Sequence, residues 1–315
     1  MTTTASVLLE AHSRERVEQV PASVKFSEPQ STHEALMRFN KKRLEPSFPT
    51  ATIGAQLQEQ VQLLLLEEKF LNAERQKVSR LAAEVPREAQ AFAAWFEALR
   101  EHGPGQFDPL FEFLATRATL EQVRWFVRQE AAGEAGFDDL VSLTQIRMPV
   151  QPKLELARNY WDEMGKGKAD GMHGPMLAHL AETLEVDGTP IEEIVWESLA
   201  LANLLVGLAM NRRYAYHSIG ALGGVELTAP SRAVRVVEAL DRLGVKKSAS
   251  YYFRLHSTVD IGHWRGWRDN VAIPIVRANP DAAVAIAEGA LMRLNAGART
   301  FARYRAQLAI EVGSS

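Results

Sequence analysis

Apolar residues recur at helical spacing along most of this chain, and no sustained stretch alternates apolar and polar residues as a half-buried strand does. Leu57, Val61 and Leu64, for example, lie three or four positions apart. Signals for helix starts follow, such as Thr119 with a glutamine three positions later, which has the form of a capping box. Pro190, directly after a threonine, is a second such signal. The sequence therefore predicts an all-α protein.

The chain divides into three parts. Residues 1–50 are polar and interrupted by prolines, which predicts a loosely structured N-terminal arm. Residues 51–105 are predicted to form auxiliary helices, and residues 106–315 form the main unit, which carries every motif described below. We expect the segment 55–101 either to pack against this unit or to form a homodimer interface.

Composition excludes several classes of function. Lys and Arg together number 36 against 39 Asp and Glu, so the chain lacks the basic charge of a nucleic-acid-binding protein. No cysteine is present, which excludes disulfides, thiolate metal sites and cysteine nucleophiles. The longest apolar run, 199–210, is too short to span a bilayer, which needs about 20 residues. Without an evident signal peptide, we expect a cytoplasmic protein.

The most informative stretch contains His256, Asp260 and His263, spaced i, i+4 and i+7. On one continuous helix these side chains would lie within about 60° of one another. Aromatic and aliphatic residues separate them, so this face is predicted to point inward, where an unpaired carboxylate is costly without a cation. Two imidazoles and a carboxylate suit iron, manganese or zinc. We interpret this stretch as a metal site rather than a polar surface stripe.

Two other segments offer partners for this site. In the first, Glu163, Asp170 and His173 flank a run with glycines at 165, 167 and 171, which predicts a broken helix or a loop of close backbone approach. In the second, glycines at 220, 223 and 224 allow a helix to pack closely and place Glu226 in a confined position.

The candidate ligands together are three kinds of side chain, Asp, Glu and His, from three segments: Glu163, Asp170, His173, Glu226, His256, Asp260 and His263. Such a set is typical of a dinuclear iron or manganese carboxylate site in a helical bundle. Glu130 and His217 are further candidates for contacting a substrate or supporting the site. For Glu130 a solvated acidic stripe is an equal alternative, and for His217 a structural role is the alternative.

These motifs, taken in order from residue 161 to residue 263, resemble the haem-oxygenase-like non-haem diiron oxidases and oxygenases, the iron-containing redox enzymes. The resemblance implies a haem-oxygenase-like helical bundle, with an N-terminal helical extension in this chain, that binds two Fe(II) ions instead of haem. It also implies that His173, Glu226, His256, Asp260 and His263 are iron ligands. Asp170 matches a carboxylate ligand of some members, and Glu163 matches an additional ligand of nitrogen-oxygenating members.

The resemblance further implies an oxidoreductase that activates O2. The leading hypothesis is oxygenation of the nitrogen of an amine or amino-acid-like substrate in a biosynthetic pathway, with an external electron donor or electrons from the substrate. The alternative is desaturation or oxidative C–C cleavage of an amino or fatty acid. Outside this class, a zinc hydrolase or a non-catalytic helical scaffold would also be compatible with parts of the pattern.

Overall fold

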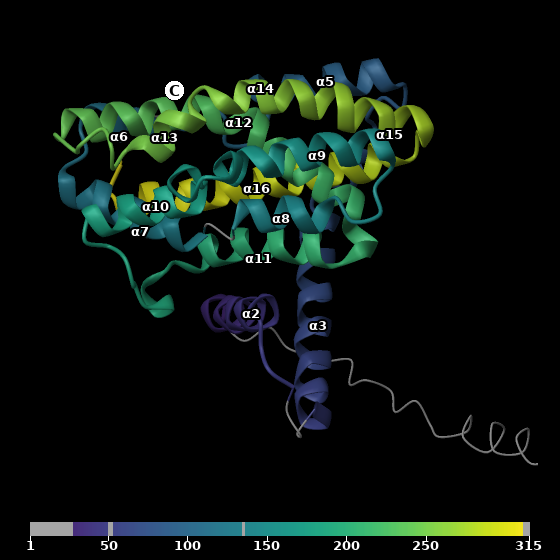
Figure 1. Ribbon diagram of the computed structural model, residues 1–315, viewed down its shortest axis with the longest axis horizontal. Helices are drawn as coiled ribbons and strands as arrows, with labels where there is room; N and C mark the ends of the chain where they lie inside the picture. Colours follow the sequence, from purple (N-terminus) through teal and green to yellow (C-terminus); the bar gives the residue numbers. More distant parts are fainter. Residues whose placement is uncertain (1–27, 50–52, 134–135, 311–315) are drawn as a thin grey trace, which may run out of the picture.

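The computed structural model describes residues 28–49, 53–133 and 136–310. Within these ranges the chain forms helices and no β-strand, which confirms the predicted all-α fold (Figure 1). In order, the α-helices are Pro29–Leu44 (α2), Ile53–Gln76 (α3), Ser79–Ala83 (α4), Ala89–His102 (α5), Pro109–Thr116 (α6), Leu120–Gly133 (α7), Phe137–Thr144 (α8), Val150–Glu163 (α9), His173–Thr183 (α10), Trp196–Met210 (α11), Ala215–Arg242 (α12), Tyr251–His256 (α13), Val259–Gly266 (α14), Ile273–Ala278 (α15) and Ala282–Gln307 (α16). Short 3-10 segments cover Gly165–Gly167 (η1), Ala169–Gly171 (η2), Ile191–Glu193 (η3) and Arg212–Tyr214 (η4), and a π-helical segment, Trp267–Ala272 (η5), joins α14 to α15.

Two long helices, α12 and α16, form the centre of the bundle and pack tightly against each other. Their contact depends on glycine. A Cβ atom on Gly220 would lie 1.8 Å from the carbonyl oxygen of Ile286, and one on Gly289 would lie 1.9 Å from that of His217. The glycine-rich stretch of α12 therefore does allow close helix packing, as the sequence predicts.

Helix α12 does not end after Glu226. It continues through Pro230 to Arg242, although proline has no N–H to offer the carbonyl of Glu226 four positions earlier. Helices α13 and α14 pack against α12, α10 packs against α13, and η5 packs against α9. This arrangement brings the ends of α9, α10, α13 and α14 to the same region of the bundle (Figure 1).

The capping box predicted at the start of α7 is confirmed. The N–H of Gln122 donates to Thr119 Oγ1 over 3.3 Å, and the N–H of Thr119 donates to Gln122 Oε1 over 2.9 Å. These two bonds satisfy donors that the first turn of a helix otherwise leaves free. The box fixes the start of the helix that carries Glu130.

The predicted N-terminal arm needs correction in its second half. Residues 1–27 and 50 lie outside the described residues, but residues 29–44 form helix α2, which packs on α11. The prolines do not prevent this helix, because Leu36 and Phe39 lie at helical spacing and are both buried. Pro29 itself is accommodated in the first turn of the helix, where a missing N–H has no cost.

The auxiliary segment packs against the bundle, one of the two roles predicted for it. Phe96 of α5 stacks on Trp264 of α14 with ring centroids 5.0 Å apart, inside the main hydrophobic core. Helix α3, by contrast, extends away from the bundle (Figure 1). Its outer part exposes an apolar face that includes Leu57, Val61 and Leu64, so the homodimer interface stays a prediction.

None of the helices in the described ranges combines the length and the apolar character needed to cross a membrane.

Candidate metal centre

A compact turn brings the first two candidate ligands together. Glu163 is the last residue of α9 and His173 the first residue of α10. The glycine-rich segment between them folds back on itself, with positive φ at Gly165 (59°) and Gly167 (82°) and a bridge between the residues that flank it. A Cβ atom on Gly165 would lie 2.3 Å from the backbone of Gly171, so glycine is required here.

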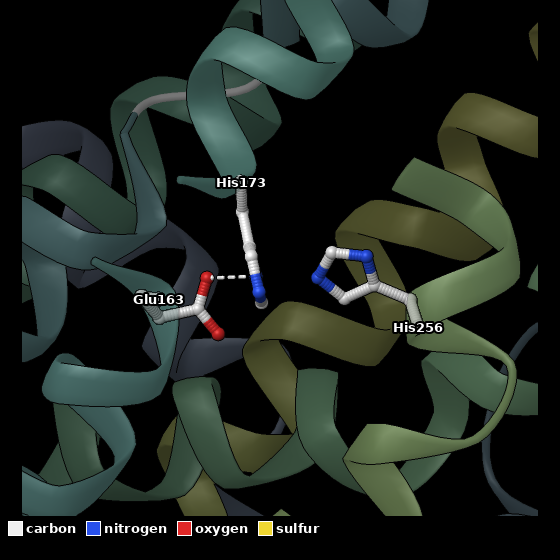
Figure 2. A group of neighbouring side chains, drawn as sticks. All are labelled: Glu163, His173 and His256. Carbon is white, nitrogen blue, oxygen red and sulfur yellow. Dashed lines mark ion pairs between the residues drawn. The ribbon is translucent and has the colours of Figure 1, made fainter. Parts of the chain in front are cut away.

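Glu163, His173 and His256 form one potential metal-binding group. Glu163 Oε2 lies 2.5 Å from His173 Nδ1, and the rings of His173 and His256 lie edge to face with centroids 4.6 Å apart. Figure 2 shows the three side chains pointing toward one another from α9, α10 and α13. Their ligand atoms all lie within 4.8 Å of one another, so small side-chain movements would bring them onto a single ion.

Glu163, Glu226 and His263 form a second group, whose ligand atoms also lie within 4.8 Å of one another. His263 Nδ1 lies 3.4 Å from Glu226 Oε2. Glu163 belongs to both groups, and a carboxylate has two oxygens with which to serve two ions. The arrangement thus fits a dinuclear site in which Glu163 is the shared ligand.

Asp260 is buried beside the second group, with its Oδ1 3.9 Å from His263 Nδ1. This buried oxygen has no hydrogen-bond partner among the described residues. Burial and the negative charges of Glu226 and Glu163 raise the pKa of Asp260 well above its usual range. Three neighbouring carboxylates in a protein interior are costly unless cations neutralise them, so these residues fit a metal centre.

Hydrogen bonds to the backbone and to Asp162 set which nitrogen of two histidines faces the cluster. His256 Nδ1 lies 2.8 Å from the carbonyl oxygen of Tyr252, and only an N–H can bond there, so Nε2 is left as the ligand atom. His263 Nε2 bonds to Asp162 Oδ2 over 3.2 Å, which turns Nδ1 toward Glu226. Such partners orient metal ligands and raise their basicity.

Sequence reasoning missed Asp162 and also Asn159, whose side-chain N–H donates to Glu226 Oε1 over 2.6 Å. Both residues lie on α9, three positions apart, so they share a face of that helix and reach toward α12 and α14. Their spacing gives no signal in the sequence, because a polar residue near a helix end is usually solvated.

The two histidines have opposite electrostatic surroundings. Burial and the neighbouring His173 lower the pKa of His256 to about 4. Burial also disfavours the charged form of His263, but hydrogen bonding and negative charge from Glu226, with a further contribution from Glu163, outweigh it and raise its pKa to about 9. A proton on His263 thus offsets part of the carboxylate charge, and a metal ion would displace it.

The predicted helix across His256, Asp260 and His263 is not continuous. It breaks at Ser257 and Thr258, whose hydroxyls donate to carbonyl oxygens three residues earlier over 2.7 and 3.1 Å. These side chains compete for backbone groups and end α13 before α14 begins. The prediction that one continuous helix carries the three side chains on a single face is therefore wrong, although all three still meet at the cluster.

Three other predicted residues belong to neither ligand group. Asp170 is exposed on η2 and is not brought to either group. His217 is buried and forms a hydrogen bond with Glu288, with Nε2 2.8 Å from Oε2, which supports a structural role instead of substrate contact. Glu130 accepts a hydrogen bond of 3.0 Å from the hydroxyl of Tyr304 and lines a cavity next to the cluster.

Solved structures from two bacteria are similar to this chain. A structure from Nostoc punctiforme PCC 73102, described as a CADD-like protein of unknown function, is 19% identical, with 78% of this chain and 99% of that chain covered and a TM-score of 0.48. A domain of unknown function with a heme oxygenase-like fold, from Shewanella denitrificans OS217, is 15% identical, with 72% and 94% covered and a TM-score of 0.48. No curated protein matches the chain.

A family model described as iron-containing redox enzyme matches residues 124–298. The match extends over more than half of the chain and includes every residue of the cluster. It confirms the family resemblance that the motifs indicate and supports iron as the metal. This chain belongs to the iron-containing redox enzyme family.

Proposed function

We propose that this protein is a non-haem diiron oxygenase that uses O2 to oxidise the nitrogen of an amine or amino-acid-like substrate. The observation that carries the proposal is the position of Glu163 in both three-residue groups. A carboxylate common to both groups suits two adjacent ions, because a single ion would use only one of the groups. Glu163 is also the residue that the family resemblance associates with nitrogen-oxygenating members.

Each residue of the cluster has a distinct part in this proposal. Glu163, His173 and His256 would hold one Fe(II) ion, and Glu163, Glu226 and His263 the other, with Asp260 beside the second. Iron bound there would supply the electrons that reduce O2 and the oxidising power directed at the substrate. Asp162 keeps the ligand nitrogen of His263 turned inward, and Asn159 holds one oxygen of Glu226 in place.

A cavity of about 150 Å³ adjoins the cluster and gives a substrate access to it. Glu163, Glu226, His256 and Asp260 form part of its wall. Most of the remaining wall is apolar, from residues such as Phe126. Such a wall excludes bulk water from the reacting groups, which prevents side reactions of an activated oxygen species.

The alternatives outside this class account for fewer features. A hydrolytic zinc ion takes three protein ligands and a water, whereas this cluster supplies six candidate ligands from α9, α10, α12, α13 and α14. A scaffold would have no reason to bury Asp260 without a hydrogen-bond partner for Oδ1. Desaturation or C–C cleavage by the same centre is the closest competing reaction.

An isotope experiment tests the proposal. Protein loaded anaerobically with Fe(II) is mixed with ¹⁸O2, a chemical reductant and a panel of amino acids and amines, and O2 uptake and product masses are measured. One ¹⁸O atom retained on substrate nitrogen is expected. A product that has lost two hydrogens, or fragments of the substrate, would contradict nitrogen oxygenation and favour the competing reaction. O2 uptake no faster than that of free iron would contradict both reactions.

Two aspartates provide a matched pair of variants for this assay. Asp260→Asn removes a buried carboxyl group at the cluster and is expected to abolish O2 uptake. Asp170→Asn makes the same chemical change at an exposed position away from both groups and is expected to leave uptake unchanged. Equal loss in both variants would contradict the assignment of the centre to the buried cluster.

A further inference from the structure

The cavity beside the metal-ligand cluster has a second charged region. Arg232 of α12, Arg293 of α16 and Glu130 of α7 line it together with the cluster. Arg232 lies six residues beyond Glu226 on the same helix, a rise of about 9 Å along the helix axis. Candidate metal ligands and two guanidinium groups therefore line the same cavity, and most of its other lining residues are apolar.

Two arginines and one glutamate from outside the metal-ligand cluster contribute to this part of the cavity wall. Burial and repulsion from Arg293 lower the pKa of Arg232 to about 9, and the attraction of Glu130 and Asp108 offsets this only in part. Asp108 also forms an ion pair with Arg305.

The two carboxylates are also engaged elsewhere. Asp108 caps α6 by accepting the N–H of Leu110 over 3.0 Å, and Glu130 accepts from the hydroxyl of Tyr304 over 3.0 Å. The buried Nε of Arg232 has no hydrogen-bond partner among the described residues. The Arg232 guanidinium carbon lies 5.0 Å from the centre of the Phe301 ring, which holds it against the cavity wall.

The size of the cavity limits what can bind. Its volume of about 150 Å³ is similar to that of an engineered protein cavity that takes up benzene. A molecule with roughly six to ten non-hydrogen atoms fills such a space, so an acid of amino-acid size fits and a long-chain fatty acid does not.

We propose that Arg232 and Arg293 bind the carboxylate of a small organic acid and so direct its other end to the metal-ligand cluster. This inference rests on the proposed function for the reaction at that other end. A planar carboxylate can accept paired hydrogen bonds from guanidinium groups, and their positive charge strengthens those bonds. The substrate class is then a compact carboxylic acid with an apolar middle, such as an amino acid with its reacting nitrogen remote from the carboxylate.

Binding of simple probes tests this inference without turnover. Hexanoate, hexanamide and dodecanoate are titrated calorimetrically into the full chain, without added metal and after anaerobic loading with Fe(II). Hexanoate is expected to bind about tenfold or more tightly than hexanamide, since hydrogen bonds to charged groups are the stronger ones. Binding measured without added metal reports the arginine region, because no metal ion is then present to coordinate the carboxylate of hexanoate.

Variants locate the effect. Arg232→Gln and Arg293→Gln are each expected to remove the preference for hexanoate over hexanamide. Arg235→Gln is the matched control, because Arg235 lies three positions further along α12 and is exposed, paired with Glu112 and Glu238. If Arg232→Gln does not fold, judged by circular dichroism, Arg293→Gln and the preference of the unaltered protein still decide the question.

Three results would overturn the inference. Equal binding of hexanoate and hexanamide would remove the carboxylate site, and an unchanged preference in both arginine variants would place it elsewhere. Tighter, Arg232-dependent binding of dodecanoate would refute the size limit. Because none of these readings requires O2 or turnover, the inference can fail while the oxygenase proposal stands, and the reverse also holds.

Discussion

The hydrogen bond between Asp162 and His263 is the most informative support of the centre to remove. Asp162 Oδ2 lies 3.2 Å from His263 Nε2, and loss of such a partner typically lowers metal affinity 10- to 100-fold. This bond is long and the Asp162 side chain is 22% exposed, so water can replace part of it. We therefore expect Asp162→Ala to lower the binding affinity for one ion about tenfold, which corresponds to about 1.4 kcal/mol.

The assay is a competition titration of Fe(II) against a chelator under anaerobic conditions. Only the ion bound by Glu163, Glu226 and His263 should weaken, while the ion at His173 and His256 keeps its affinity. Lys166→Ala is the control. Lys166 Nζ lies 3.3 Å from Asp162 Oδ1, and the Lys166 side chain is 71% exposed, so this variant removes a charged neighbour of Asp162 that does not contact His263. Two sites with unchanged affinity in Asp162→Ala, or equal weakening of both sites, would refute the reasoning.

Three further predictions concern packing, pH and assembly. Gly220→Ala should destabilise the fold by about 3 kcal/mol in urea unfolding, because the new Cβ would lie 1.8 Å from the carbonyl oxygen of Ile286; a loss below about 1 kcal/mol would contradict the close packing. Burial lowers the pKa of His33 to about 4, so the unfolded state binds the proton first as pH falls. From pH 7 to 4.5 the free energy of unfolding should therefore drop about 2 kcal/mol more in the unaltered protein than in His33→Gln. Parallel curves of unfolding free energy against pH would disprove this. If α3 forms a homodimer interface, light scattering should give twice the chain mass, and a double Leu57→Gln, Leu64→Gln variant should give a monomer; a monomeric unaltered protein would remove the interface.

The sequence could point to candidate ligands, because metal chemistry restricts the side-chain types that can serve. Few side chains can share a buried position with an imidazole and a carboxylate, so His256, Asp260 and His263 stand out in an apolar stretch. The glycine positions were informative for a steric reason. Only a close backbone approach requires glycine at 165, and the structure has that approach.

What the sequence could not show depends on contacts between segments far apart in the chain. Asp162 and Asn159 look like ordinary helix-end polar residues until α14 and α12 are placed against them. The break at Ser257 depends on hydroxyl–carbonyl bonds that compete closely with continuing the helix. Asp170 lies at the spacing of a ligand, but the turn that brings Glu163 to His173 leaves it on the outside.

The proposed carboxylate site at Arg232 and Arg293 could not be predicted from the sequence for the same reason. They lie on α12 and α16, 61 positions apart, and each would be interpreted alone as a solvated helix residue. Only the packing of these helices around the cavity makes them neighbours of Glu130.

The central claim is that Glu163 is shared by two iron ions. A crystal structure of protein loaded anaerobically with Fe(II), with anomalous data collected at the iron absorption edge, tests it most directly. The account predicts two peaks about 3.5–4 Å apart, one beside His173 and His256 and the other beside Glu226 and His263, with one oxygen of Glu163 on each. A single peak, or two peaks that Glu163 does not join, would contradict it.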